Sequence, residues 1–467
     1  MVFSSPVFIW VFLPPVLLIY HLCGRKLRNI VLLMSSLVFY AWGEPVYIFL
    51  MIFSILINYI AGLLIDRFRG DSFRKKLILA ADIVINLLLL GYYKYFNFFV
   101  DIINNLFRSS LKNRDISLPI GISFFTFQIL SYIIDLYRDK YEVQRDPLKL
   151  ALYISFFPQL IAGPIVQYDS IRRQLDHRTE SFEKAASGIK RFIYGLAKKV
   201  LIANTMARFV DTVYEANSAY SGMIIWLATV AYALQIYYDF SGYSDMAIGL
   251  GKMFGFEFRE NFNYPYMSSS IHEFWQRWHI SLGAWFREYL YFPLGGNRKG
   301  RVRTYINLMI VFLLTGLWHG ASMTFVLWGL FHVLFQIMER AGFDSVLNRH
   351  RIFAHCYSLI VVIFGWVLFR ADTIAQVLEI VTQMLLPWKY THTSAILQEV
   401  LTHRFIVMFI LGVAGMGLLQ KPLKRITVSI STVLVNIFEY SYCMLILLLS
   451  MASLAGNTYN PFIYFRF

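Results

Sequence analysis

Two histidines that stand next to tryptophans are the residues of this chain best suited to chemistry. His319 follows Trp318 in the string TGLWHG, between two apolar runs, and His279 follows Trp278 in RWH. Because an unperturbed imidazole has a pKa of about 6.5, either side chain can take up or release a proton near neutral pH. An ionisable side chain within apolar sequence is costly and by default suggests a function. The pattern therefore favours a functional role for His319 over a purely structural one.

The sequence also allows structural roles for these histidines. His319 could be a core histidine bonded to a neighbour or a residue at the water interface, although Gly316 and Gly320 would let a backbone or a ligand approach it closely. His272 precedes His279 by seven residues, a spacing that could serve a metal, but HEFWQ lacks the second histidine of a zinc HExxH motif. We therefore expect no metal site.

The element that carries His279 is predicted to be a polar helix from Ser270 to about Tyr291. Ser269 or Ser270 is a suitable N-cap, and Glu273 completes a capping box. Helical spacing would bring its large apolar residues together, namely Phe274, Trp275, Trp278, Leu282 and Trp285. Such a helix is too polar to span a membrane alone. We expect it on the cytoplasmic side, ending at the basic loop 298–303.

Composition places both histidines in a membrane protein. Of the 467 residues, 58% are hydrophobic and only 15% are charged, and the mean hydropathy is +0.55. Soluble domains have about 25% charged residues, and their interiors are too small to bury so much apolar surface. The same figures exclude a disordered chain, a disulfide scaffold and a coiled coil. Three separated cysteines without a CxxC pair do not indicate a metal ribbon or a redox pair.

The positive charge is expected to fix topology and not to bind nucleic acid. The chain carries 43 Lys and Arg against 28 Asp and Glu, a net charge of +15. In a multi-pass protein such residues hold loops in the cytoplasm and contact anionic lipid headgroups. We predict that the loops 25–28, 67–76, 298–303 and 421–425 are cytoplasmic, and that the N-terminus and the segment 371–403 lie outside.

Apolar runs long enough for membrane helices follow one another along the chain. A break at Gly43-Glu44-Pro45 predicts a tight turn between two of them, and His332 is expected at a helix end. The runs lie at 6–23, either side of that break, and near 77–100, 116–137, 148–166, 190–214, 222–256, 304–318, 322–338, 352–370, 404–420 and 429–454. Pro158, Gly163 and Pro164 interrupt one run. Broken segments survive at membrane depth where protein or a watery cavity surrounds them.

Five ordered strings closely resemble the membrane-bound O-acyltransferase family. They are SLPIGISFFTFQ, SFFPQLIAGPI, YYDFSGYSDMAIGLGKMFGFEFRENFNYPY, FWQRWHISLGAWFREYLYFPLGGNR and GLWHG. The resemblance extends from about Ser117 to His332, and the closing NPFIYFRF is also similar. Within the family, YFPLGGNR favours the bacterial branch that acts on alginate, cellulose or peptidoglycan over the branch that transfers D-alanine to teichoic acid.

The resemblance implies an all-α polytopic fold. We expect roughly ten to twelve transmembrane or re-entrant helices around a central tunnel, with polar helices on the cytoplasmic side. A single domain, 1–467, would consist of N-terminal helices (1–115), a motif-bearing catalytic core (116–340) and C-terminal helices (341–467). The tunnel would join a cytoplasmic donor site to an outward-facing acceptor site.

The resemblance also implies the chemistry and the site. His319, in the WHG context, would be the general base that draws a proton from the acceptor hydroxyl, and His279 would orient the thioester or stabilise the oxyanion. Trp318, Trp278, Arg277, Asn297, Arg298 and Lys299 are expected to bind substrate. For the loop 298–303, phosphate binding and membrane anchoring are about equally supported. Asp239 and Asp245 are expected to partner arginine or histidine.

Substrates and partners follow from the same resemblance. Acetyl-coenzyme A would be the donor substrate, with no permanently bound cofactor. The acceptor would be an extracytoplasmic polysaccharide of the alginate, cellulose or peptidoglycan type, reached through an SGNH-like acetyltransferase partner, at the inner membrane of a bacterium. The alternative is a transporter or channel in which the histidines relay protons without acyl chemistry.

Overall fold

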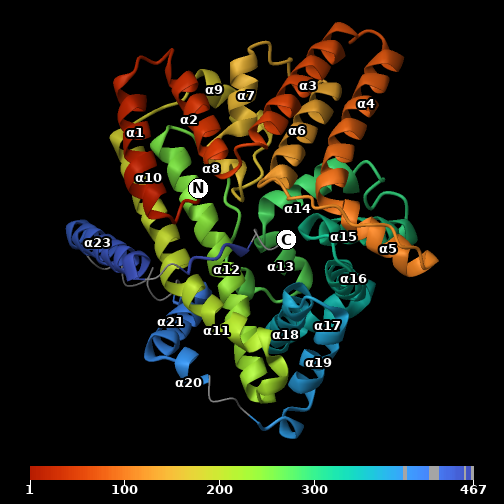
Figure 1. Cartoon of the computed structure of the whole chain (residues 1–467), viewed down its shortest axis with the longest axis vertical. Coiled ribbons are helices and arrows are strands. Elements are labelled where there is room, and N and C mark those ends of the chain that lie inside the picture. Colours follow the sequence, from red (N-terminus) through yellow and green to blue (C-terminus); the bar gives the residue numbers. More distant parts are fainter. Residues whose placement is uncertain (393–396, 420–430, 457–458, 464–467) are drawn as a thin grey trace. The chain divides into compact units, whose positions relative to one another are not determined.

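The computed structural model describes residues 1–467 except 393–396, 420–430, 457–458 and 464–467, and every regular element in the described part is a helix (Figure 1). Six helices are long and apolar enough to cross a membrane: 48–67, 72–107, 222–253, 301–319, 351–370 and 433–456. Four shorter apolar helices lie at 7–22, 122–137, 374–385 and 403–418. The expected all-α polytopic fold is confirmed. The loop 421–425, predicted to be cytoplasmic, lies outside the described residues.

The helices form two compact units. The first comprises residues 1–192 and 246–259, and the second comprises 193–245 and 260–467. The boundaries fall within α10 (Phe182–Ala197) and α12 (Gly222–Met253). The expected three segments of a single domain stay a prediction.

The first unit contains the helices from the N-terminus to α10. They are η1 (Val7–Phe12), α1 (Leu13–Leu22), α2 (Arg28–Gly43), α3 (Ile48–Arg67), α4 (Ser72–Leu90), η2 (Gly91–Tyr95), α5 (Phe96–Phe107), α6 (Ile122–Tyr137), α7 (Pro147–Ser155), α8 (Phe157–Leu160) and α9 (Tyr168–Asp176). The turn predicted at Gly43-Glu44-Pro45 separates α2 from α3. Asp146 caps α7, and Pro147 occupies its first position, where a missing N–H costs nothing.

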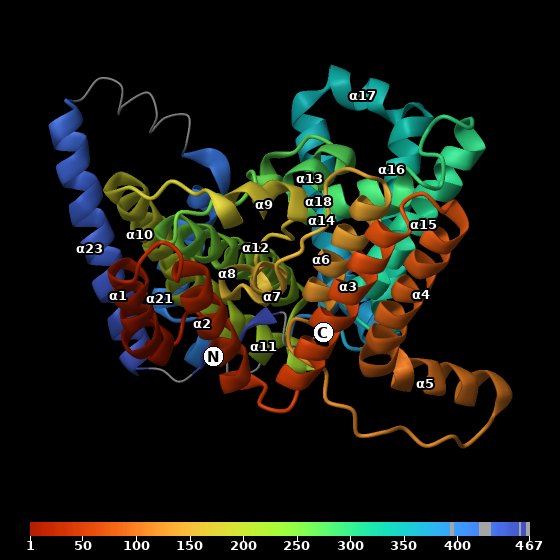
Figure 2. The ribbon, with the colours of Figure 1, turned by 90° about the horizontal axis from the view of Figure 1, so that it is seen from above.

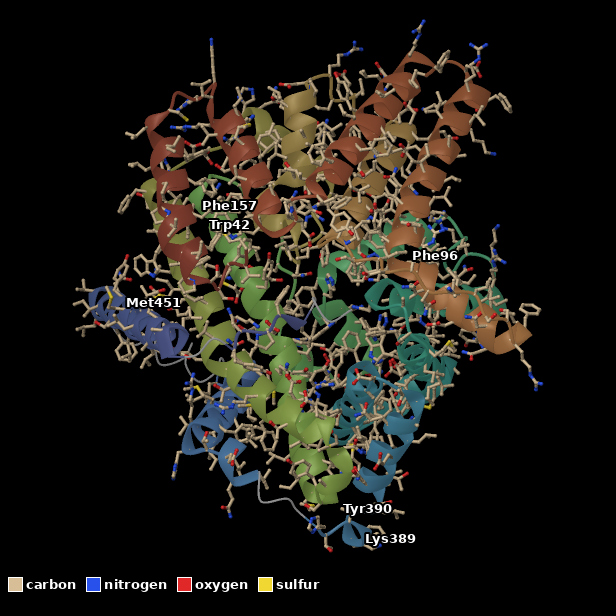
Figure 3. All side chains as sticks on the ribbon, viewed as in Figure 1. Trp42, Phe96, Phe157, Lys389, Tyr390 and Met451 are labelled. Atoms are coloured by element: carbon tan, nitrogen blue, oxygen red, sulfur yellow. The ribbon has the colours of Figure 1, made fainter. Side chains whose placement is uncertain are left out.

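The broken apolar run after α7 is buried in protein, as its prolines and glycines predict. Phe157, labelled in Figure 3, follows α7. Its ring lies 5.5–6.2 Å, centroid to centroid, from those of Phe8, Phe12 and Phe39. Gly121 has φ +79°, and a Cβ there would lie 2.8 Å from the carbonyl oxygen of Leu160. The turn before α6 therefore needs glycine for its backbone conformation and for its contact with α8.

The second unit holds both histidines. Besides α12, its elements are η3 (Lys198–Ala203), α11 (Asn204–Glu215), η4 (Asn217–Ala219), η5 (Pro265–Met267), α13 (Ile271–Arg277), α14 (Ile280–Phe286), η6 (Arg287–Tyr291), α15 (Arg301–His319), α16 (Met323–Met338), η7 (Glu339–Phe343), α17 (Asp344–Arg349), α18 (Arg351–Arg370), α19 (Ile374–Leu385), η8 (Pro387–Lys389), α20 (Leu397–Val400), α21 (His403–Val413), η9 (Ala414–Leu418) and α23 (Thr432–Gly456).

Helices α15 and α16 form the most closely packed pair around the site and lie side by side (Figures 1 and 2). A Cβ on Gly316 would lie 2.3 Å from the carbonyl oxygen of Phe325, and one on Gly329 would lie 2.3 Å from that of Phe312. These contacts show that the two helices are antiparallel and that their backbones lie close together. His332 lies inside α16 and is buried, so the expected helix end at this residue is wrong.

Helix α18 packs antiparallel against α16, because Phe369 contacts Phe325 near one end and Tyr357 contacts Phe335 near the other. His319 and Arg370 therefore lie at one end of the three helices. The basic start of α15 lies at the opposite end. The placement of 298–303 and 371–403 on different sides of a membrane stays a prediction.

Substitution of Gly329 by alanine should push α15 and α16 apart. A methyl group 2.3 Å from a backbone oxygen cannot be accommodated without a backbone shift, and such overpacking costs about 1–3 kcal/mol. We expect Gly329→Ala to lower the thermal midpoint in detergent, measured by tryptophan fluorescence. Gly91→Ala is the matched control, since nothing lies within 4 Å of its Cβ position. Equal midpoints for the two variants would contradict the close packing.

Candidate active site

The helix predicted over Ser270 to Tyr291 is interrupted at His279, the residue that this helix was expected to position. α13 ends at Arg277, Trp278 is extended, and α14 begins at Ile280. Between them His279 has φ +44° and ψ +55°, the left-handed region that residues other than glycine rarely occupy. Such strain persists where surrounding structure enforces it and is concentrated at functional sites. The expected N-cap is correct: the Ser270 hydroxyl accepts from the backbone N–H of Glu273.

A neighbouring extended segment holds this break in place. The N–H of Asn263 donates to the carbonyl oxygen of Arg277, and the N–H of Ile280 donates to that of Asn261, both at 2.9 Å. Backbone groups freed by the helix interruption are thus satisfied on each side of His279. The ring of His279 is 1% exposed, and the Phe240 ring lies against it with a centroid distance of 4.6 Å.

His319 is the last residue of α15. It is 5% exposed, and the rings of Trp328 on α16 and Phe369 on α18 lie 5.1 and 5.2 Å from it, centroid to centroid. Gly320 follows in extended conformation, and the Phe325 ring occupies the space that a Cβ would need. Three helices therefore fix the position of this imidazole.

Trp318 lies between the two histidines. Its ring centroid is 5.0 Å from that of His319 and 5.9 Å from that of His279. The structure thus brings the two predicted catalytic residues into contact with the same indole. Trp278, also predicted, is 2% exposed and contacts Trp366 and Phe274.

Each histidine lines a cavity of its own. His279 lines a cavity of about 320 Å³ between α13, α14, α15 and α16, within the size range of small-molecule sites. His319 lines a cavity of about 10 Å³ with Phe240, Trp278 and Trp328, room for about one water molecule. A small molecule therefore has space beside His279, and only a small group has space beside His319.

Four predicted binding residues line neither cavity. Arg277 pairs with Glu273 at 2.7 Å on its own helix. Asn297, Arg298 and Lys299 are exposed in the loop before α15. This loop is ordered by the Asn307 amide, which donates to the carbonyl oxygen of Gly296 at 2.8 Å.

Two arginines that the sequence reading missed line the larger cavity. They are Arg287 at the start of η6 and Arg340 in η7. His272, Gln276 and Gln336 are further polar residues of its wall. Arg340 is distant in sequence from the motif around His279, so no local pattern could have shown that it shares a cavity with Arg287.

Residues 461–463, called the closing segment below, are held beside His319 by a buried ion pair. Lys199 and Asp239 are each 3% exposed, and their charged atoms lie 2.7 Å apart. Lys199 donates to the carbonyl oxygen of Pro461, and Asp239 accepts from the N–H of Ile463 at 3.0 Å. The side chain of Ile463 lines the small cavity at His319. The ion pair thus positions one wall of this cavity.

The acidic residues of YYDFSGYSD have lysine partners. Asp239 pairs with Lys199, and Asp245 pairs with Lys198 at 2.5 Å. The expectation that they partner a basic residue is confirmed in kind, and the partners that the structure shows are lysines. The two lysines are the first two residues of η3.

Burial controls the charge of His279, which lies outside the six membrane-spanning helices. Loss of water contact lowers the pKa of its imidazole to about 3. The side chain is therefore neutral at physiological pH and can act as a base or a hydrogen-bond partner.

Comparison with known proteins matches residues 91–375 to the membrane-bound O-acyltransferase family. The chain belongs to this family. The matched range contains both histidines and the whole lining of the larger cavity. Membership makes the protein a multi-pass membrane O-acyltransferase, in agreement with the expectation from its motifs.

Relatives are found over the whole chain. A probable alginate O-acetylase AlgI of Pseudomonas putida is 38% identical, with all of both chains covered. A peptidoglycan O-acetyltransferase of Helicobacter pylori is 35% identical over 82% of this chain and 80% of its own. A teichoic acid D-alanyltransferase of Bacillus subtilis is 29% identical over 46% of this chain and 57% of its own.

Removing one partner of the Lys199–Asp239 pair should destabilise the second unit. An uncompensated buried charge costs about 3–5 kcal/mol, so Lys199→Met should lower the thermal midpoint strongly. The double variant Lys199→Met/Asp239→Leu should recover much of this stability. Lys199→Met loses the contact to Pro461, and the double variant loses the contact to Ile463 as well, so carboxypeptidase should trim both variants faster than the native chain. Native trimming rates in the double variant would show that the pair does not hold the closing segment.

Proposed function

We propose that the protein transfers an acetyl group from cytoplasmic acetyl-coenzyme A to an acceptor outside the cytoplasmic membrane of a bacterium. The observation that carries this proposal is the pair of buried histidines that both contact Trp318, each next to a cavity. The printed names of the relatives support acyl transfer to alginate or peptidoglycan. An SGNH-like partner would carry the group onward.

In the proposed reaction His319 is the general base. It takes the proton from the acceptor hydroxyl while the hydroxyl oxygen forms a bond to the thioester carbonyl carbon. The tetrahedral intermediate then collapses, the carbon–sulfur bond breaks, and the coenzyme A sulfur leaves as a thiolate that takes up a proton. The small cavity at His319 has room for a hydroxyl group and excludes bulk water.

The cavity beside His279 would hold the thiol end of the donor. Acetyl-coenzyme A carries phosphates, and arginine binds phosphate through paired N–H donors. Arg287 and Arg340 line this cavity, whereas Arg298 and Lys299 lie in the exposed loop before α15. Both pairs are candidates for binding the donor's phosphates. Arg287 and Arg340 are favoured because they line the cavity.

Substitution of His319 by alanine should abolish transfer. Loss of a general base lowers the rate by about 10²–10⁴. The measurement is acetyl transfer from acetyl-coenzyme A by purified protein in nanodiscs, with folding checked by size exclusion. His350→Ala is the matched control, because His350 is an exposed histidine of the same unit. Near-native transfer by His319→Ala would contradict the assignment.

Neutralising the cavity arginines should weaken donor binding. A hydrogen bond to a charged group is worth about 1.5–3 kcal/mol, so Arg287→Gln and Arg340→Gln should each raise the Kd for acetyl-coenzyme A by about tenfold or more. Titration calorimetry measures this directly. The Kd of the double variant Arg298→Gln/Lys299→Gln is measured for comparison with those of the two cavity variants. A larger effect from the loop pair than from the cavity arginines would place the phosphates at the loop.

A further inference from the structure

The side-chain amide of Asn261 is buried, and the hydrogen-bond partners of its oxygen and nitrogen atoms show which atom is which. The side chain is 1% exposed. Its Oδ1 accepts from the backbone N–H of Ser281 at 3.1 Å and from the hydroxyl of the same residue at 2.9 Å. Its Nδ2 donates to the hydroxyl oxygen of Ser244 at 3.3 Å. Because a backbone N–H can only donate, the atom facing Ser281 must be the amide oxygen.

This orientation fixes the proton on His279. Its Nδ1 lies 3.2 Å from the same Oδ1 of Asn261. An amide oxygen only accepts hydrogen bonds, so Nδ1 must carry the hydrogen. A neutral imidazole holds one ring proton, and Nε2 is therefore left with a lone pair. Nε2 is buried and has no hydrogen-bond partner among the described residues, and the side chain lines the cavity of about 320 Å³.

We infer that Asn261 is a positioning residue that holds His279 in the Nδ1–H tautomer and leaves its Nε2 as a hydrogen-bond acceptor. The Phe240 ring, at 87° to the imidazole, prevents the ring from turning over. In this state Nε2 can accept a hydrogen bond from an N–H, O–H or S–H group of a molecule in the cavity. It cannot donate one to a developing oxyanion, so the expected oxyanion role of His279 is replaced by an acceptor role.

The tautomer can be read directly on the resting protein. Full-length protein with ¹⁵N-labelled histidine in nanodiscs should show, by NMR, a protonated Nδ1 and an unprotonated Nε2 for His279. The signal is assigned by its absence in His279→Gln. Asn261→Leu should lose this preference, whereas Asn261→Asp, which still offers an acceptor oxygen, should keep it. A proton on Nε2 in the native protein would overturn the inference.

Kinetics provide a second readout, which rests on the proposed acetyl transfer. Asn261→Leu should lower kcat by about 10- to 100-fold, the usual effect of removing a group that orients a functional histidine, and Asn261→Asp should restore most of it. Asn263→Leu is the matched control, since Asn263 is exposed two residues away. Native kcat in Asn261→Leu would contradict a positioning role.

The two readouts separate this inference from the proposed function. If no acetyl transfer is found but Nδ1 is protonated, the proposed function fails and the assignment of Asn261 stands. If transfer occurs and Nε2 is protonated, the inference alone is wrong. Should Asn261→Leu not fold, the native tautomer and the Asn261→Asp variant still decide.

Discussion

A buried polar group must find its partner inside the protein, and the site of this acyltransferase depends on that constraint. Asn261 provides the partner of His279, and the backbone of its segment pairs with the residues on each side of the helix break. Lys199 and Asp239 neutralise one another and bind the backbone of the closing segment. Without these contacts each group would carry the cost of lost water hydrogen bonds. The same interactions that stabilise the second unit therefore position its chemistry.

The two histidines differ in what the structure lets them do. His279 is in a strained backbone conformation, has one nitrogen engaged by Asn261, and faces a cavity large enough for part of a substrate. His319 is the last residue of α15, which packs tightly against α16, and it lines a cavity with room for a small group. Trp318 contacts both rings. This division of space suits a reaction in which donor and acceptor approach one centre from different sides.

Much of this could be predicted from the sequence, and the rest depends on distant contacts. Composition gave the membrane class, the Gly43-Glu44-Pro45 turn was visible, and TGLWHG and RWH identified the histidines. The break at His279 was missed because no glycine or proline marks it and the aromatic spacing continues through it. Asn261, Arg340 and the partners of Asp239 were missed because side-chain contacts between separate helices leave no periodic signal.

The most direct test is a structure with an unreactive thioether analogue of acetyl-coenzyme A bound to the protein in a nanodisc. Its sulfur should lie in the cavity lined by His279, with the acetyl carbon directed toward Trp318 and His319 and the phosphates near Arg287 and Arg340. Density for the analogue outside this cavity, with both histidines remote from the sulfur, would contradict the assignment of the site.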